Sequence, residues 1–345
     1  EWENLKENDL AGQGETLAKF NYNMPIPNYR FSLRREIEGS TDYINRNLAP
    51  ADKPVKVVLW TGNALPPEQA LAIADELGLR NLNGGNTSVT HSNPTMTRVS
   101  PMLRPQGRYL QVYAPQINEN VYTNYMLGPL WGYRRAIETY QITDQPRRLK
   151  PIDIYYHFYS AASPGALRAL HQVYEYVLTQ ETLPLYASDW SDVATQWYHT
   201  GIARHLDGGW MVKGADHMRT LRLPTSLGWP DLQRSSNVAG VREITSGRYV
   251  ALSGESGATL YLTPNPPQTP HLRYASGRIT EWQRHSARHI SLSLAAEQVP
   301  LNVELAATQG CQVKADARQE QRGNSTLLTF GRSHAERIEV ICASR

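Results

Sequence analysis

The stretch of this chain best suited to chemistry is residues 151–160, and His157 is its leading candidate for catalysis. Read with the two-residue period of a β-strand, the stretch has one apolar and one polar face. The two faces comprise Ile152, Ile154, Tyr156 and Phe158 on the apolar side and Asp153, Tyr155, His157 and Tyr159 on the polar side. An imidazole at a strand end can act as a general acid, because histidine exchanges protons near neutral pH. The alternative role is structural, as a core histidine bonded to Asp153 or to a tyrosine.

Polar side chains also recur on one face of the predicted strands 80–84 and 109–115. They are Asn81, Asn83, Tyr109, Gln111 and Tyr113. Amides and phenols turned inward need hydrogen-bond partners, which a ligand, water or a closed polar network can supply. We favour the ligand-facing interpretation over the satisfied network.

The loops that follow the predicted strands are rich in asparagine and aromatic residues. They lie at residues 60–63, 83–86, 118–124 and 189–190. Flat rings beside amides and carboxylates are typical of sugar-binding sites, and Gly84-Gly85 would let the backbone approach a ligand closely. As alternatives, Asn-Gly pairs are ordinary turn formers, and Trp60 could be a core residue.

Helices and strands alternate through the first two-thirds of the chain. The expected strands are 55–61, 80–84, 109–115, 151–159 and 183–188, and the expected helices are 32–48, 66–78, 131–141 and 164–179. This order is typical of a parallel α/β sheet or barrel, whose reactive side chains collect at the carboxyl ends of the strands. From about residue 203 short apolar runs alternate with Gly, Pro, Ser and Asn, which predicts an all-β, sandwich-like module. The predicted domains are therefore 1–202 and 203–345.

The composition narrows the functional classes. A length of 345 residues suits two domains, and 40% hydrophobic with 19% charged residues is ordinary for a soluble protein. A net charge of +3 without a basic stripe argues against nucleic acid, and no apolar run is long enough for a transmembrane segment. Tyrosine (19) and tryptophan (8) outnumber phenylalanine (4), a bias that suits sugar binding.

Three residue pairs have spacings or chemistry that bear on metal binding, glycoside hydrolysis and disulfide formation. His285 and His289 have the spacing of a metal pair, but the second runs directly into a predicted strand, so metal binding there is disfavoured. Glu119 and Asp189 could serve as paired carboxylates for glycoside hydrolysis, although sequence does not give their separation. Cys311 and Cys342 fit either one disulfide in an exported protein or two buried thiols in a cytosolic one.

Several long motifs resemble one enzyme family. They include Asn-Leu-Asn-Gly-Gly-Asn at 81–86, Gln-Val-Tyr-Ala-Pro at 111–115 and Ile-Tyr-Tyr-His-Phe-Tyr-Ser at 154–160, with further agreement at 29–37, 43–44, 118–124, 147–151 and 206–210. These stretches resemble the deacetylase part of the bifunctional hydrolase–deacetylases of Pel exopolysaccharide biosynthesis, which are similar to polysaccharide deacetylases. The resemblance covers nearly the whole chain and is firmest over residues 20–210.

The resemblance implies a distorted (β/α)₇ barrel followed by a β-domain in a periplasmic protein. It implies a divalent metal, usually Zn²⁺, that activates water to attack the acetamide of N-acetylated sugars, held by an Asp and two His while a second Asp acts as base. A strand-end histidine protonates the leaving amine, and only this role maps onto the chain, at His157. The metal-binding motifs have no counterpart here, so we expect an incomplete barrel, metal ligands upstream of Glu1, and an inactive chain when taken alone.

The resemblance also gives substrate surfaces and partners. The expected substrate-binding residues are Trp60, Asn83, Asn86, Glu119, Tyr122 and Tyr159. The implied substrate is a Pel-type exopolysaccharide containing N-acetylgalactosamine or N-acetylglucosamine, with outer-membrane export machinery as a further partner. Implied export favours the disulfide between Cys311 and Cys342. The rival interpretations are a glycoside hydrolase and a non-catalytic carbohydrate-binding module formed by the β-domain.

Overall fold

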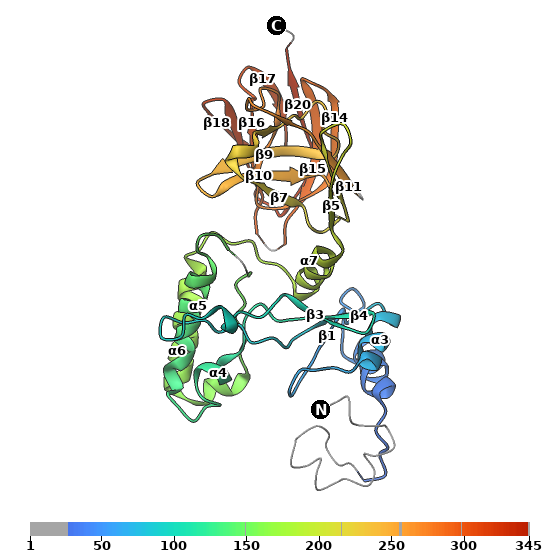
Figure 1. The fold of residues 1–345 in the computed structure, drawn as a ribbon, viewed down its shortest axis with the longest axis vertical. Helices are drawn as coiled ribbons and strands as arrows, with labels where there is room; N and C mark the ends of the chain where they lie inside the picture. The colour runs from blue at the N-terminus through green and yellow to red at the C-terminus, as the bar shows by residue number, and fades with distance from the viewer. Residues whose placement is uncertain (1–26, 149, 215, 255–256, 298, 344–345) are drawn as a thin grey trace. The chain divides into compact units, whose positions relative to one another are not determined.

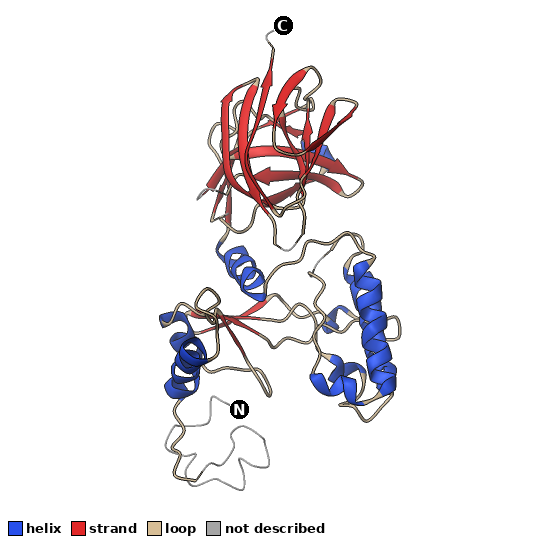
Figure 2. Ribbon diagram, turned by 180° about the vertical axis from the view of Figure 1, so that it is seen from behind, coloured by secondary structure: helices blue, strands red, loops and turns tan. Residues whose placement is uncertain are grey.

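The computed structural model describes residues 27–148, 150–214, 216–254, 257–297 and 299–343 (Figure 1). Its contacts divide the chain into two compact units, the first made of residues 1–181 with 187–195 and the second of residues 182–186 with 196–345. The first unit mixes helices with a few short strands, whereas strands dominate the second (Figure 2). No helix in the described ranges is long and apolar enough to cross a membrane.

The first unit begins with a helical segment and a parallel β-α-β unit. The segment comprises a π-helical turn η3 (Arg35–Gly39) and α2 (Ser40–Asn47). Strand β1 (Val57–Leu59) pairs in parallel with β2 (Arg80–Leu82), and helix α3 (Glu68–Glu76) connects them. Leu33, Val58 and Trp60 pack against a buried cluster that includes Ile37 and Ile73. The helices predicted at 32–48 and 66–78 are therefore confirmed.

A separate antiparallel hairpin lies beside this pair of strands. Strands β3 (Leu103–Gln106) and β4 (Tyr109–Val112) pair antiparallel across Gly107, whose φ of +57° suits a tight turn. Strand β4 then runs beside the end of β2, because Asn83 N donates to Val112 O at 3.1 Å and Ala114 N to Gly84 O at 3.2 Å. The predicted strand at 109–115 is present as β4, whereas β3 was not predicted from the sequence.

Three helices form the rest of the first unit around a tyrosine-rich core. The 3₁₀ turn η5 (Leu130–Arg135) leads into α5 (Ala136–Thr143), and α6 (Pro164–Leu178) packs against them. The buried side chains include Tyr133, Tyr140, Leu170 and Val173. Both predicted helices, 131–141 and 164–179, are confirmed.

Residues 151–157 are extended but do not form the predicted strand. Side chains, not a neighbouring strand, take up two of their main-chain groups: Tyr140 OH donates to Asp153 O at 2.8 Å, and His157 N donates to Glu119 Oε1 at 2.8 Å. The alternation still holds, because Ile152, Ile154 and Tyr156 pack on the apolar cluster of this unit. It ends at Phe158, which is 93% exposed at the start of the 3₁₀ turn η6 (Phe158–Ala162).

The strand predicted at 183–188 is wrong. Helix α7 spans Ala187–His199, so Asp189 and Trp190 are helical and not part of a loop. Leu183 and Leu185 before it are about half exposed and have no strand partner. Without this strand and the one at 151–159, no closed barrel forms in the described part of the chain; the first unit has only the β1–β2 and β3–β4 pairs.

The second unit is largely β, as predicted. Its strands are β5 (Gly201–Arg204), β6 (Trp210–Lys213), β7 (Thr220–Leu223), β8 (Trp229–Pro230), β9 (Val238–Ile244), β10 (Gly247–Leu252), β11 (Gly257–Leu260), β12 (Leu262–Thr263), β13 (His271–Ala275), β14 (Arg278–Ser286), β15 (His289–Ala295), β16 (Asn302–Ala306), β17 (Cys311–Lys314), β18 (Arg318–Arg322), β19 (Ser325–Thr329) and β20 (His334–Cys342). Three short turns complete the described elements. They are η4 (Met96–Arg98) and α4 (Glu119–Tyr122) in the first unit and η7 (Thr225–Leu227) in the second.

Two of its sheets share one apolar core. The larger has the order β18-β19-β16-β13-β9-β10-β7, and the smaller has the order β14-β15-β20-β17. Alternate residues of β15, namely Ile290, Leu292 and Leu294, are fully buried in this core. Cys311 lies opposite Cys342 on the neighbouring strands β17 and β20, and the two are joined in a disulfide. The bond fits an oxidising compartment and confirms the pairing that the resemblance favoured.

Candidate functional site

Glu119 holds His157 through both its main chain and its ring. Oε1 of Glu119 accepts the His157 main-chain N–H at 2.8 Å, and both carboxylate oxygens lie 3.1 Å from Nδ1 of the imidazole. The carboxylate is only 1% exposed and also accepts the hydroxyl of Ser160 at 3.1 Å. A buried carboxylate with several donors is fixed in position, so it fixes the imidazole as well.

The sequence places Glu119 here through a local cap. Asn118 precedes α4 and its side-chain oxygen accepts the main-chain N–H of Asn120 at 3.1 Å. The cap begins the short helix at Glu119, immediately beyond the polar end of the loop that follows β4. Glu119 was predicted as a substrate-binding residue; the structure places it instead against the predicted catalytic histidine.

Tyr159 stacks on the other side of the same imidazole. The two rings lie 4.7 Å apart with an interplanar angle of 8°. The Tyr159 hydroxyl donates to Asn120 Oδ1 at 2.8 Å and lies 3.0 Å from Nδ1 of His157. Because this hydroxyl has already given its proton to Asn120, it accepts from Nδ1, as the Glu119 carboxylate does. Nδ1 therefore carries the ring proton, and Nε2 is the nitrogen that exchanges a proton.

Nε2 of His157 is the chemically available atom of the site. The His157 side chain is 37% exposed, so the ring is not enclosed by the core. Within the described residues Nε2 has no hydrogen-bond partner, whereas Nδ1 has three neighbouring acceptor atoms. A half-exposed imidazole with one fixed and one open nitrogen can give a proton to, or take one from, a bound molecule.

Asn83 and Trp60 reach the same site through Tyr155. Nδ2 of Asn83 lies 2.5 Å from Trp60 O and 2.7 Å from Tyr155 OH. The Tyr155 ring in turn lies 5.9 Å from the His157 ring. Segments far apart in the sequence, after β1, β2 and β4 and at residues 155–159, thus meet, although the last of these is not the strand that was predicted.

Asp153 lies on the same polar face and is held in a low-polarity environment. Burial raises its pKa to about 7, and a hydrogen bond from the Gln116 main chain opposes this in part. Burial also raises the pKa of Tyr133 and Tyr140, and the nearby Asp153 adds to both shifts. Asp153 is thus a second group able to exchange a proton near neutral pH. Of the two partners named in the structural alternative for His157, the tyrosine is present as Tyr159, whereas no bond to Asp153 is formed.

Asn81 and Gln111, two of the inner polar residues of β2 and β4, belong to a satisfied network, and the ligand-facing interpretation is wrong for these two. Gln111 is fully buried, and its amide donates to Ala64 O at 2.6 Å and Asn83 O at 2.8 Å while accepting from Arg104 at 3.0 Å. Asn81 receives the indole N–H of Trp60 at 3.1 Å. Both N–H donors of the Gln111 amide are therefore used within the protein.

The Gly84-Gly85 pair lets protein, not ligand, approach the backbone. A Cβ atom at Gly84 would lie 2.6 Å from Gln111 Nε2, and one at Gly85 would lie 2.9 Å from the Tyr113 ring. Both residues have positive φ, and so does Asn83 at +110°. The loop is therefore shaped by its packing on β4.

Three predicted substrate-binding residues have no side-chain contact with the His157 ring among the described residues. Tyr122 is only 9% exposed and its hydroxyl bonds to Thr139 at 2.8 Å, so it is a core residue. Trp60 is partly buried against the cluster near α3, which makes it a core residue too. Asn86 is exposed, and its main-chain N–H bonds to Ser100 Oγ at 2.5 Å. Sequence reasoning missed Asn120 and Ser160, although the Asn118 cap was a usable signal for the first.

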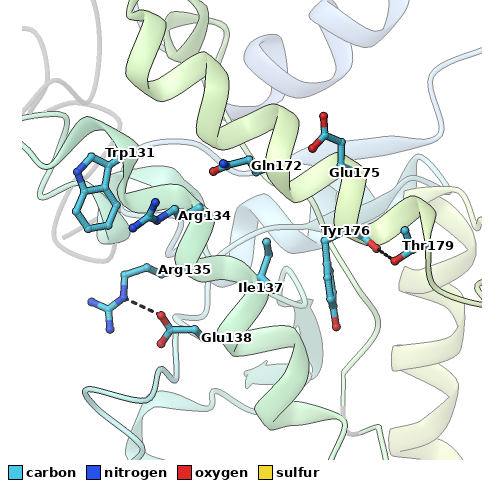
Figure 3. Close-up of a pocket in the computed structure, with 9 residues that line it drawn as sticks. All are labelled: Trp131, Arg134, Arg135, Ile137, Glu138, Gln172, Glu175, Tyr176 and Thr179. Atoms are coloured by element: carbon cyan, nitrogen blue, oxygen red, sulfur yellow. Dashed lines mark hydrogen bonds and ion pairs between the residues drawn. The ribbon is translucent and has the colours of Figure 1, made fainter.

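A separate hollow of about 800 Å³ lies on η5, α5 and α6 (Figure 3). The Arg134 guanidinium lies 4.2 Å from the Trp131 ring centre, and Arg135 pairs with Glu138 at 3.2 Å. Arg134 thus covers one flat face of the tryptophan, the surface on which a sugar would stack. None of the residues around His157 lines this hollow, and it takes no part in the candidate site.

A catalytic metal would need at least three converging protein ligands in the described ranges. No three His, Cys, Asp or Glu side chains converge there to hold an ion. His285 and His289 are neighbours, but Nε2 of His285 bonds to Ser291 at 2.8 Å and Nε2 of His289 to Glu339 at 3.0 Å. The described residues therefore do not fit a bound catalytic metal.

Comparison with known proteins gave no match to a family model, a curated protein or a solved structure.

Proposed function

We propose that this chain belongs to a polysaccharide N-deacetylase, in which His157 gives a proton to the amine that leaves during amide hydrolysis. The observation that carries the proposal is the asymmetric imidazole: Nδ1 is bound by Glu119 and Tyr159, while Nε2 faces outward on a side chain that is 37% exposed. The motif resemblance supports an N-acetylated, Pel-type exopolysaccharide as the substrate.

The chemistry assigned to the chain is one proton transfer with its electrostatic support. When the C–N bond of the tetrahedral adduct breaks, the nitrogen takes the proton from Nε2 and departs as a neutral amine, with acetate as the other product. Before that step the imidazole carries a positive charge, and the buried Glu119 carboxylate stabilises it from the opposite side of the ring. Tyr159 holds the ring plane by stacking.

The remaining features of the proposal rest on the resemblance. They are a fold of the (β/α)₇ polysaccharide-deacetylase type in the first unit, a divalent metal such as Zn²⁺, a periplasmic location and contact with outer-membrane export machinery. The described residues supply no metal site. The disulfide of the second unit supports the oxidising compartment.

The glycoside hydrolase alternative is less well supported by the geometry. Glu119 would have to present a carboxylate to a sugar, but its oxygens are buried and bound to His157 and Ser160. The other candidate, Asp189, lies on α7. Release of new reducing ends, without free acetate, from an N-acetylated oligosaccharide would favour this alternative.

Replacement of His157 tests the proposal. In the native protein with Zn²⁺ supplied, His157→Ala should lower kcat for acetate release from an N-acetylated oligosaccharide by about 100-fold or more. His171→Ala, an exposed histidine on α6, is the matched control and should leave kcat unchanged. Undiminished acetate release in the His157 variant rejects the proton-donor role.

A further inference from the structure

The larger sheet of the second unit extends beyond the core that it shares with the smaller sheet. Ala251 on β10 and Ala275 on β13 pack against the edge of that core, and the same two residues line an open hollow of about 330 Å³. Strands β7, β10, β9 and β13 are consecutive neighbours in the sheet, and the first three are labelled in Figure 1. The hollow is therefore a built feature of a rigid sheet, with small side chains as part of its lining.

Arginine and tyrosine alternate across these strands beside the small residues. In the strand register Arg222 of β7 lies opposite Tyr249 of β10, and Tyr249 lies opposite Arg242 of β9. The guanidinium of Arg242 then lies 5.1 Å from the ring centre of Tyr274 on β13. The row runs perpendicular to the strands, and its last three residues line the hollow.

The hollow is strongly basic. Its charged lining residues are Arg219, Arg242, Arg273 and Arg278, and the described lining contains no carboxylate. Arg273 pairs with Glu304 at 3.1 Å, and Arg219 donates to the main-chain oxygens of Ser253 and Ile279. In contrast, Arg242 and Arg278 form no ion pair with any described residue. Two guanidinium groups thus remain to receive an anion.

We propose that this hollow is a binding site for a carboxylate-bearing saccharide, such as a uronate unit of an acidic polysaccharide. Guanidinium groups bind carboxylates through paired hydrogen bonds, which neither a neutral sugar nor an amine offers. The volume suits one or two sugar rings, and the hydroxyl of Thr220 is suited to a sugar hydroxyl. The site is remote in sequence from His157, and the inference does not depend on the proposed deacetylase activity.

Single-stranded nucleic acid is the less suitable polyanion. Binding of bases relies on open aromatic faces for stacking. Here Arg242 covers one face of Tyr274, and the Tyr249 hydroxyl is bonded to Ser246 Oγ at 3.0 Å. The arrangement favours recognition of charged groups over stacking of bases.

Calorimetric titration of the full chain with a hexamer of galacturonic acid tests the site. We expect saturable binding that Arg242→Ala and Arg278→Ala each weaken about tenfold, as loss of a charged hydrogen bond would. Arg242→Lys keeps the positive charge but loses the paired N–H donors of the guanidinium, so it should weaken binding less than Arg242→Ala does. Arg318→Ala is the control, because Arg318 is an exposed arginine on the edge strand β18 of the same unit.

A neutral hexamer is the ligand control, and several outcomes would contradict the proposal. The hexamer with its carboxylates reduced to alcohols should not bind, and equal binding of that neutral form overturns it. Absence of uronate binding, unchanged affinity in both arginine variants, or equally tight binding of single-stranded DNA of the same charge also overturns it. Arg278 forms no side-chain hydrogen bond with a described residue, so its replacement keeps the test valid even where Arg242→Ala fails to fold.

Discussion

Glu119 and His157 are joined by the main-chain N–H of the histidine at 2.8 Å and by its ring Nδ1 at 3.1 Å from each carboxylate oxygen. The two residues are 38 positions apart in the chain, so the tertiary fold brings them together. The main-chain bond sets the position of the histidine backbone, and the ring bond sets the orientation of the imidazole. A single buried carboxylate thus controls both where His157 lies and which of its nitrogens is open.

Glu119→Gln should separate this orienting role from mere packing. An amide of the same size keeps an acceptor for the His157 main chain, but it removes the charge that stabilises an imidazolium. We expect kcat for acetate release to fall at least tenfold with little change in KM, and the free energy of unfolding to fall by about 1–3 kcal/mol. Steady-state kinetics and urea unfolding measure the two effects.

The control for this variant is Glu175→Gln, an exposed carboxylate on α6. It should change neither kcat nor stability. Nitrogen NMR of His157 adds a readout that packing alone would not move: the proton should leave Nδ1 for Nε2 in the Glu119 variant, and retention on Nδ1 contradicts the assigned role.

Asp153→Asn should change the pH dependence of stability. Burial raises the pKa of Asp153 to about 7 from an ordinary value of 3.8. Between these pH values the folded chain keeps a proton that the unfolded chain has released, so this group makes the native state less stable as pH rises. The asparagine variant lacks the effect and should gain stability over the native chain from pH 4 to pH 7.

The expected gain in the free energy of unfolding of the asparagine variant above pH 7 is on the order of 2–4 kcal/mol. We expect the lower end of this range because Asp153 is partly exposed. Urea unfolding of both proteins at pH 4, 5, 6, 7 and 8 measures it. Parallel stability curves for the two proteins would show that Asp153 titrates normally in the folded chain. The Gln116 main-chain N–H retains an acceptor in the variant, so loss of that bond does not confuse the comparison.

The helices of the first unit could be predicted because their signals are local. Pro66-Pro67 and Ser163-Pro164 mark helix starts, and Gly78 with φ of +66° marks an end. Local signals could not decide the strand predicted at 183–188, because a strand needs a partner strand that only the tertiary fold supplies. The run had the right composition, but Leu185 is 58% exposed and the chain enters α7.

The site could be predicted in part for a related reason. Period-two alternation placed Asp153, Tyr155 and His157 on one polar face, and the structure keeps them there without a strand ladder. Alternation does not reveal what covers a face, so buried Gln111 and Tyr122 were taken for ligand contacts. The union of Glu119 with His157 depends on the path of the chain between them, which has no local signature.

Gly84→Ala should destabilise the loop that connects β2 to the site. Its φ of +91° is costly for alanine, and the added Cβ would lie 2.8 Å from Ala64 O and 2.6 Å from Gln111 Nε2. Strain and collision together should cost about 2–4 kcal/mol in the free energy of unfolding. Gly62→Ala is the matched control, because its φ is +63° but nothing lies within 4 Å of the new Cβ. It should cost only about 1 kcal/mol, and equal losses in the two variants would contradict the collision.

Removal of the disulfide should weaken the second unit alone. Cys311 and Cys342 are the only cysteines of the chain, and 31 positions separate them. Closing a loop of this length limits the unfolded chain and is worth about 3–4 kcal/mol. The double variant Cys311→Ala with Cys342→Ala should lose that amount, and reduction of the native chain should reproduce the loss.

Hydrogen exchange resolves the two units. In the double variant the amides of β15 and β20 should exchange faster, while those of α6 keep their native protection because that unit contains neither cysteine. Equal acceleration in α6 would show instead that the two units unfold as one cooperative body.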